Sequence, residues 1–157
     1  MAGMGTYYLT DPQMNMPFNG AKLALYLGDL MAVILRDADG AIPFPGYWDL
    51  PGGGREGVEA PLDCALRETR EELGLIVPPQ AVHWGRAFDE AGQTKWFFVA
   101  ALRPEVAEDV IFGDEGQRWA LMEEAEFLRH PRAVPQFQAR LAAYVRERQA
   151  PKSPPLP

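Results

Sequence analysis

The sequence predicts an α+β fold, in which helices cover a β-sheet. Apolar runs on both sides of Gly28-Asp29, and again on both sides of residues 89–93, are typical of antiparallel hairpins. Apolar residues recur at helical spacing over residues 61–73 and 134–148. Strands and helices in this mixed order indicate a layered α+β or α/β/α domain.

The chain is expected to begin with an irregular arm over residues 1–20, followed by one globular domain over residues 21–148. After the first hairpin, the sequence predicts a turn at Asp39-Gly40 and a short strand at residues 48–50. The glycines at 52–54 are expected to interrupt regular structure.

The second hairpin is expected to join strands over residues 81–88 and 94–103. A further strand over residues 117–122 and a short helix over 123–128 precede the last helix. The chain ends in a Pro-rich segment, residues 149–157, which predicts a disordered tail.

Composition narrows the classes of function. Apolar residues make up 47% and charged residues 24%, which is typical of a soluble globular protein, and no apolar run is long enough to cross a bilayer. The single cysteine, Cys64, excludes an internal disulfide, and with no recognisable signal peptide a cytoplasmic location is expected. A net charge of −7 argues against long nucleic acid as a partner. A small anionic ligand remains possible if a cation in the site offsets the repulsion.

The helix over residues 61–73 is expected to pack one face on the sheet. Pro61 suits its first turn and Gly74 suits its end. Leu62, Leu66, Thr69 and Leu73 recur at helical spacing and define the buried face.

The opposite face carries Glu68, Glu71 and Glu72, whose like charges at these spacings destabilise a helix by a few tenths of a kcal/mol each. One interpretation is a solvated acidic face that Arg67 tethers. The other is a metal site, because Mg²⁺ and Mn²⁺ bind clustered carboxylate oxygens. The nearby glycines favour the second interpretation, since backbone without side chains can approach a phosphate or a metal closely.

Residues 53–75 resemble the Nudix box, whose pattern is G-x5-E-x7-R-E-U-x-E-E-x-G-U, where U is a bulky apolar residue. Gly53, Glu59 and the run from Arg67 to Leu75 match this pattern, and the one departure is Thr69 at the first U position. The preceding residues, WDLPGG, are also similar to the usual lead-in of the family.

The resemblance implies the Nudix fold, an α/β/α sandwich with a mixed β-sheet in which the box forms a loop–helix–loop. It implies hydrolysis of a nucleoside diphosphate linked to another group, with Mg²⁺ or Mn²⁺ as cofactor. Dimers are frequent in the family, so a homodimer is compatible with the resemblance.

Roles can be carried over by position in the motif. The resemblance implies that Glu71 and Glu72 are metal ligands, that the Gly52 carbonyl joins them, and that Glu68 is a ligand or the base for the attacking water. Arg67 would hold the carboxylates in place. Gly53 and Glu59 would support the site.

Two further residues match MutT-like members of the family. The segment DEGQRWALM is similar to their E-G-Q…W segment, which implies that Glu115 adds a metal-site carboxylate; a solvated turn is the alternative. Arg36 falls where they have a phosphate-contacting Arg; an exposed strand-end Arg is the alternative. Their base-selecting Asn has no counterpart, because Val134 is the nearest match, so the resemblance does not extend to a preference for 8-oxo-dGTP.

The leading hypothesis is therefore a MutT-like pyrophosphohydrolase that cleaves a nucleoside triphosphate to the monophosphate and pyrophosphate. An alternative is a hydrolase of nucleoside diphosphate sugars, ADP-ribose or dinucleoside polyphosphates. An alternative of another class is a non-catalytic nucleotide-binding sensor domain.

Overall fold

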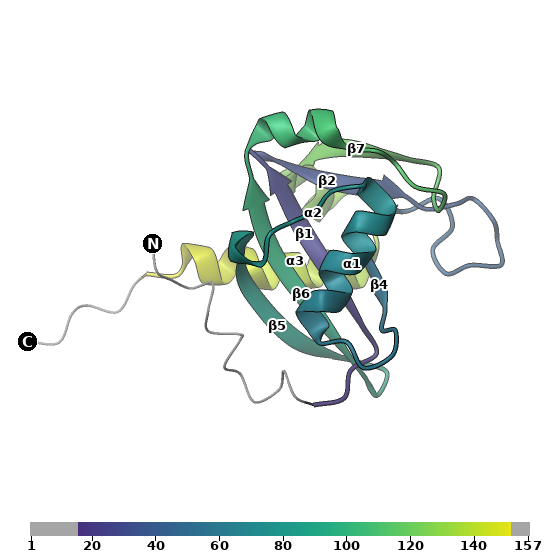
Figure 1. The fold of residues 1–157 in the computed structure, drawn as a ribbon, viewed down its shortest axis with the longest axis vertical. Helices are drawn as coiled ribbons and strands as arrows, with labels where there is room; N and C mark the ends of the chain where they lie inside the picture. The colour runs from purple at the N-terminus through teal and green to yellow at the C-terminus, as the bar shows by residue number, and fades with distance from the viewer. Residues whose placement is uncertain (1–15, 152–157) are drawn as a thin grey trace, which may run out of the picture.

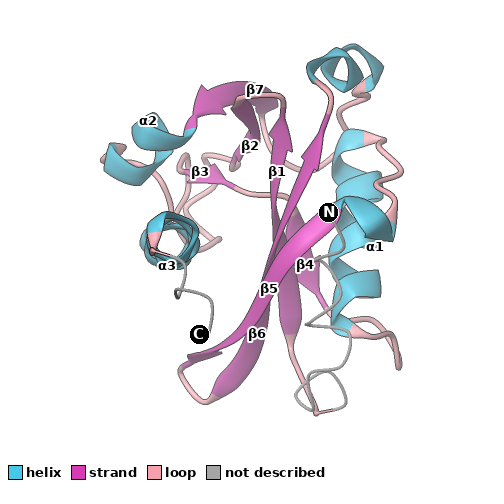
Figure 2. Cartoon of the chain, turned by 90° about the vertical axis from the view of Figure 1, so that its left-hand side faces the viewer, coloured by secondary structure: helices cyan, strands magenta, loops and turns pink. Residues whose placement is uncertain are grey.

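A mixed β-sheet lies between helix α1 on one face and helices α2 and α3 on the other, in a computed structural model that describes residues 16–151 (Figures 1 and 2). The strands are β1 (Gly20–Leu27), β2 (Leu30–Leu35), β3 (Trp48–Asp49), β4 (Gly52–Gly54), β5 (Val82–Glu90), β6 (Gln93–Leu102) and β7 (Arg118–Glu123). The α-helices are α1 (Pro61–Leu73), α2 (Glu124–Arg129) and α3 (Pro135–Gln149), and the 3-10 helices are η3 (Pro79–Ala81) and η4 (Pro104–Asp109).

The strand order is β3-β2-β1-β6-β5, with β4 paired to β1 and β7 paired to β2. Strand β1 runs parallel to β6, whereas the other pairs are antiparallel, so the sheet is mixed. The expected α+β class and α/β/α sandwich are confirmed. Most of the expected arm and tail lies outside the described residues; Gly20 already belongs to β1, and α3 continues through Gln149.

The segment between β3 and β4 fills a fork in this sheet. Strands β1 and β2 pair at the hairpin, through Tyr26 with Met31 and Leu27 with Leu30. Farther from the hairpin, β3 pairs with the end of β2 and β4 pairs with the start of β1. The segment from β3 to β4 is therefore hydrogen-bonded to both diverging strands.

The expectation that the glycines at 52–54 interrupt regular structure is wrong, because they form strand β4. A β-carbon on Gly52 would lie 2.2 Å from the carbonyl oxygen of Ala21, and the φ angle of Gly52 is +136°. Only a residue without a side chain fits so close to β1 in this conformation.

The two hairpins and helix α1 are confirmed where the sequence predicts them. The second hairpin is tighter than expected, since Asp89 and Glu90 remain paired in β5 and only Ala91-Gly92 makes the turn. Both turn residues have positive φ angles, of 53° and 84°. Two-residue turns of this kind match the twist of the paired strands.

Side chains of β6 alternate between two hydrophobic clusters, one on each face of the sheet. Trp96 and Phe98 belong to the cluster that includes Leu62 and Leu73 of α1, whereas Phe97 and Val99 belong to the cluster that includes residues of α3. This alternation fixes α1 against one face and α3 against the other. Within residues 16–151, no helix has the length and apolar character needed to span a membrane.

Candidate active site

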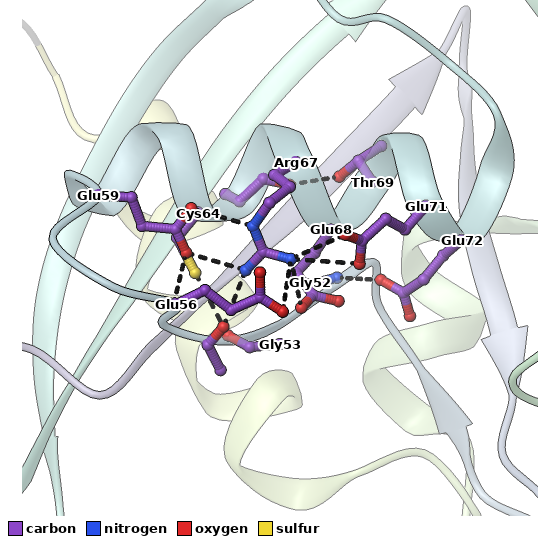
Figure 3. Close-up of polar contacts among 12 residues, drawn as sticks. Gly52, Gly53, Glu56, Glu59, Cys64, Arg67, Glu68, Thr69, Glu71 and Glu72 are labelled. Carbon is purple, nitrogen blue, oxygen red and sulfur yellow. Dashed lines mark hydrogen bonds and ion pairs between the residues drawn. The ribbon is translucent and has the colours of Figure 1, made fainter.

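Arg67 is the centre of an ion-pair network on α1 (Figure 3). Its Nε and Nη2 atoms donate to the two carboxylate oxygens of Glu59 at 3.0 and 2.8 Å. Its Nη1 atom donates to Glu68 at 3.1 Å and to Glu71 at 3.1 Å, and Nη2 also donates to the Gly54 carbonyl at 3.0 Å. A single guanidinium thus offsets the repulsion between Glu68 and Glu71 and ties them to the β4 backbone.

Glu72 points away from this network and bonds to β4 instead (Figure 3). Its Oε1 atom accepts the N–H of Gly52 at 2.7 Å. Burial raises the pKa of Glu72 to about 7, although the nearby charge of Lys22 acts in the opposite direction. Glu72 is therefore held at strand β4, in surroundings that disfavour its charged form.

Glu68 occupies the space where a side chain on Gly53 would lie. A β-carbon on Gly53 would be 2.7 Å from Cδ of Glu68. The Glu68 side chain is 16% exposed, and its burial raises its pKa while the bonds from Arg67 lower it. Gly53 thus allows the carboxylate to lie directly on the backbone of β4.

A cavity of about 370 Å³ adjoins Glu72 and is lined by Ile34, Arg36, Asp37, Ile42, Asp49, Glu72, Glu115 and Gly116. The loop before β7 is hydrogen-bonded to the end of β2. The backbone N–H of Gln117 donates to the Leu35 carbonyl at 2.8 Å, and its side-chain Nε2 atom donates to the Arg36 carbonyl at 2.8 Å. The structure thereby brings Arg36, Glu72 and Glu115 to one cavity from three distant parts of the chain. Glu68 and Glu71 are not among its lining residues.

Asp49 is a site residue that the sequence reasoning missed. It is 5% exposed and receives bonds from Arg36 at 2.8 Å and from Lys22 at 3.2 Å. The available signal was an acidic residue between Trp48 and Leu50, in a segment predicted to be a strand. A buried carboxylate is retained where cations pair with it, and here it fixes the Arg36 side chain at the cavity wall.

The donor atoms around β4 fit a hard divalent cation by their chemistry. Glu68, Glu71 and Glu72 supply carboxylate oxygens and Gly52 supplies a carbonyl oxygen, which are the ligands that Mg²⁺ and Mn²⁺ prefer. In the part of the chain that the structure describes, no three acidic, His or Cys side chains are grouped closely enough to hold a metal ion. Glu68 and Glu71 accept hydrogen bonds from Arg67, whereas Glu72 accepts one from the Gly52 N–H. Binding a cation with all three carboxylates therefore requires side-chain rotation.

The NUDIX domain family model matches residues 23–144. The chain belongs to the Nudix family. An uncharacterized Nudix hydrolase of Pseudomonas aeruginosa is 43% identical over 54 residues, which cover 34% of this chain and 32% of that protein. The chain thus matches about a third of that relative's length.

Solved structures share the Nudix fold with this chain. The MutT protein of Methanosarcina mazei Go1 aligns with a TM-score of 0.66 and 18% identity over 85% of this chain and 97% of that chain. A C. elegans Ap4A hydrolase, solved as a binary complex, aligns with a TM-score of 0.62 and 20% identity over 80% and 95% of the two chains. A bifunctional NMN adenylyltransferase/ADP ribose pyrophosphatase of Francisella tularensis, complexed with AMP and a Mn ion, aligns with a TM-score of 0.65 and 15% identity. The alignment covers 92% of this chain and 45% of that chain.

The departure from the Nudix box at Thr69 is accommodated inside the core. Thr69 is fully buried, and its hydroxyl donates to the Ala65 carbonyl at 2.8 Å. A buried hydroxyl costs little when it is bonded in this way. Thr69 is therefore compatible with an unbroken helix α1. The helix ends at Leu73 and is capped by Gly74, which has a left-handed φ of 68°.

Glu59 should make the Nudix box sensitive to acid. The bond from Arg67 holds the pKa of Glu59 at about 2, below its ordinary value of 4.5. Between these values the unfolded chain binds a proton that the folded chain does not, so the free energy of unfolding falls as pH falls. The contribution is complete above about pH 4.5 and is lost as the pH approaches 2. We expect Glu59→Gln to flatten this part of the stability profile, measured by urea unfolding between pH 6 and pH 2.5.

Glu108→Gln is the matched control, because Glu108 is exposed on η4. It should follow the wild-type profile. A Glu59→Gln variant that loses stability with acid as steeply as the wild type would contradict the role of the Arg67–Glu59 pair.

Proposed function

We propose that this Nudix chain is a phosphoanhydride hydrolase that uses Mg²⁺ or Mn²⁺ and cleaves a nucleoside triphosphate to the monophosphate and pyrophosphate. The observation that carries the proposal is the position of Glu72. Its carboxylate is bonded to the Gly52 amide and lines the same cavity as Glu115 and Arg36. Acidic and basic groups that share one cavity suit a cation and a polyphosphate together.

The negative charge of the protein favours a cation as a bridge to such a substrate. The net charge is −7, and Glu72, Asp49 and Glu115 line the cavity. In this proposal Glu71 and Glu72, with the Gly52 carbonyl, hold Mg²⁺ or Mn²⁺, and Glu115 is a further ligand. The bound cation would offset charge on the phosphate oxygens and make the attacking water a stronger acid.

In this proposal Arg36 binds a phosphate oxygen of the substrate. Its Nε atom donates to the Pro43 carbonyl at 2.9 Å and its Nη1 atom donates to Asp49 at 2.8 Å. These two bonds hold the guanidinium at the wall of the cavity. An Arg that is already oriented loses little freedom when a phosphate binds it.

Glu68 is the proposed general base. Burial raises the pKa of Glu68 in the metal-free protein. Arg67 bonds to Glu68 Oε1 at 3.1 Å and thereby fixes the orientation of the carboxylate above Gly53. In this scheme Glu68 accepts the proton of the attacking water, and Arg67 acts as a positioning residue.

The fold alone leaves the substrate open, since a MutT protein, an ADP ribose pyrophosphatase and an Ap4A hydrolase align with similar TM-scores. The test is a panel of nucleoside triphosphates, ADP-ribose, nucleotide sugars and Ap4A with Mg²⁺ or Mn²⁺. Products are identified by ³¹P NMR, and reaction in ¹⁸O-labelled water identifies the attacked phosphorus. We expect a triphosphate to yield monophosphate and pyrophosphate. Faster cleavage of another substrate would replace the triphosphate assignment, and nucleotide binding without turnover would favour the sensor alternative.

A further inference from the structure

The ammonium group of Lys22 directly contacts the backbone of strand β4. The side chain comes from β1, in the register position opposite Gly52, and is 16% exposed. Its Nζ atom lies 3.0 Å from the Gly52 carbonyl oxygen, 3.1 Å from the Leu50 carbonyl oxygen, and 3.1 and 3.2 Å from the two carboxylate oxygens of Asp49. The ammonium is thus surrounded by four oxygen atoms, which satisfy its three N–H donors.

These oxygens are of the type that a hard divalent cation takes. They include the Gly52 carbonyl, which the proposed function assigns to Mg²⁺ or Mn²⁺. Glu72 bonds to the N–H of the same residue at 2.7 Å, so Lys22 and Glu72 hold Gly52 from its two ends. A divalent cation and an ammonium on one carbonyl oxygen would repel each other at close range.

We propose that the Lys22 ammonium is a built-in competitor of the divalent cation for the Gly52 carbonyl. Binding of the cation to this oxygen then requires Lys22 to release it. The proposal rests on the proposed function, because it assigns Gly52 to the metal. It follows that Lys22 weakens metal affinity in the absence of substrate, while in the metal-free protein it stabilises the buried Asp49.

The first test is a titration of the full-length protein with Mn²⁺ at about pH 8 without nucleotide, in which free Mn²⁺ is followed by electron paramagnetic resonance. We expect Lys22→Met to tighten Mn²⁺ binding roughly tenfold, which lies within the range of typical coupling between two interacting sites. Lys22→Gln should act in the same direction and is the more conservative variant if Lys22→Met folds poorly. Thermal melts establish that each variant is folded.

Lys95→Met is the matched control. Lys95 lines the same small cavity as Lys22, Gly53 and Gly54, and within residues 16–151 it forms no ion pair. Its removal deletes the same charge without freeing the Gly52 carbonyl. Screening should limit its effect on Mn²⁺ affinity to less than about twofold.

A second measurement uses the wild-type protein and does not depend on any Lys22 variant folding. We expect the Lys22 ammonium, held by four oxygens, to exchange its protons slowly enough for ¹H–¹⁵N correlation spectra. Spectra of Lys95→Met and Lys152→Met exclude the other two lysines of the chain as its source. We expect diamagnetic Mg²⁺ to shift or remove the Lys22 signal. An unchanged signal at saturating Mg²⁺ would overturn the competition.

The outcomes separate this inference from the proposed function. If Glu72→Gln weakens Mn²⁺ binding but the Lys22 variants bind it no more tightly than the wild type, the competition is wrong and the metal site stands. If the wild type binds no Mn²⁺, or Glu72→Gln leaves its binding unchanged, the proposed metal site itself is wrong.

Discussion

Replacement of Glu72 by Gln is expected to lower kcat/KM for Mg²⁺-dependent nucleotide hydrolysis roughly 10²- to 10³-fold, which corresponds to a loss of several kcal/mol of transition-state stabilisation. The amide oxygen of Gln can still accept the Gly52 N–H, but it lacks the negative charge that a divalent cation requires. Stability should not fall, because burial already disfavours the ionised form of Glu72 and raises its pKa to about 7. Steady-state kinetics and thermal melts measure the two effects separately.

Asp63→Asn is the control for this variant, since Asp63 is an exposed acidic residue in the first turn of the same helix. It removes one exposed negative charge from α1 and should keep near wild-type kinetics. Wild-type turnover by a folded Glu72→Gln protein would refute the role of Glu72.

Replacement of Gly52 by Ala is expected to lower the free energy of unfolding by about 3 kcal/mol or more, because backbone strain and overpacking each cost about 1–3 kcal/mol. The new β-carbon would lie 2.2 Å from the Ala21 carbonyl oxygen and 2.6 Å from Cα of Lys22, both of which are backbone atoms of β1. The φ of +136° adds strain for any residue with a side chain. Strand β4 would have to separate from β1, and the Gly52 N–H and carbonyl would then leave Glu72 and Lys22. Urea unfolding measures the loss.

Gly54→Ala tests whether the effect belongs to the position or to the loss of any glycine in β4. A β-carbon on Gly54 would meet its nearest atom, the Asn19 carbonyl oxygen, at 3.9 Å, which is an ordinary contact. The free energy of unfolding of this variant should lie within about 0.5 kcal/mol of the wild-type value. Equal destabilisation by the two alanines would show that close approach to β1 is not what requires Gly52.

The sequence by itself determined the elements whose signals are local. Helix α1 begins at Pro61 and ends before Gly74, as predicted, because helix start and stop depend on the φ preferences of those residues and on a short apolar period. The hairpin at Gly28-Asp29 and the pattern of residues 53–75 are local in the same sense. The pattern was sufficient to identify the family. In the structure, Arg67 contacts both Glu68 and Glu71.

Only the tertiary structure decided which oxygen each charged group contacts. Glu72 bonds to Gly52, Lys22 to Asp49 and Gly52, and Arg36 shares a cavity with Glu115, although these residues are far apart along the chain. These contacts depend on the fork between β1 and β2 and on the register of β4 against β1, which together place Gly52 opposite Lys22. Strand register is set by long-range pairing and by the absence of side chains where backbones meet, so the glycines that suggested a break in structure instead form a strand.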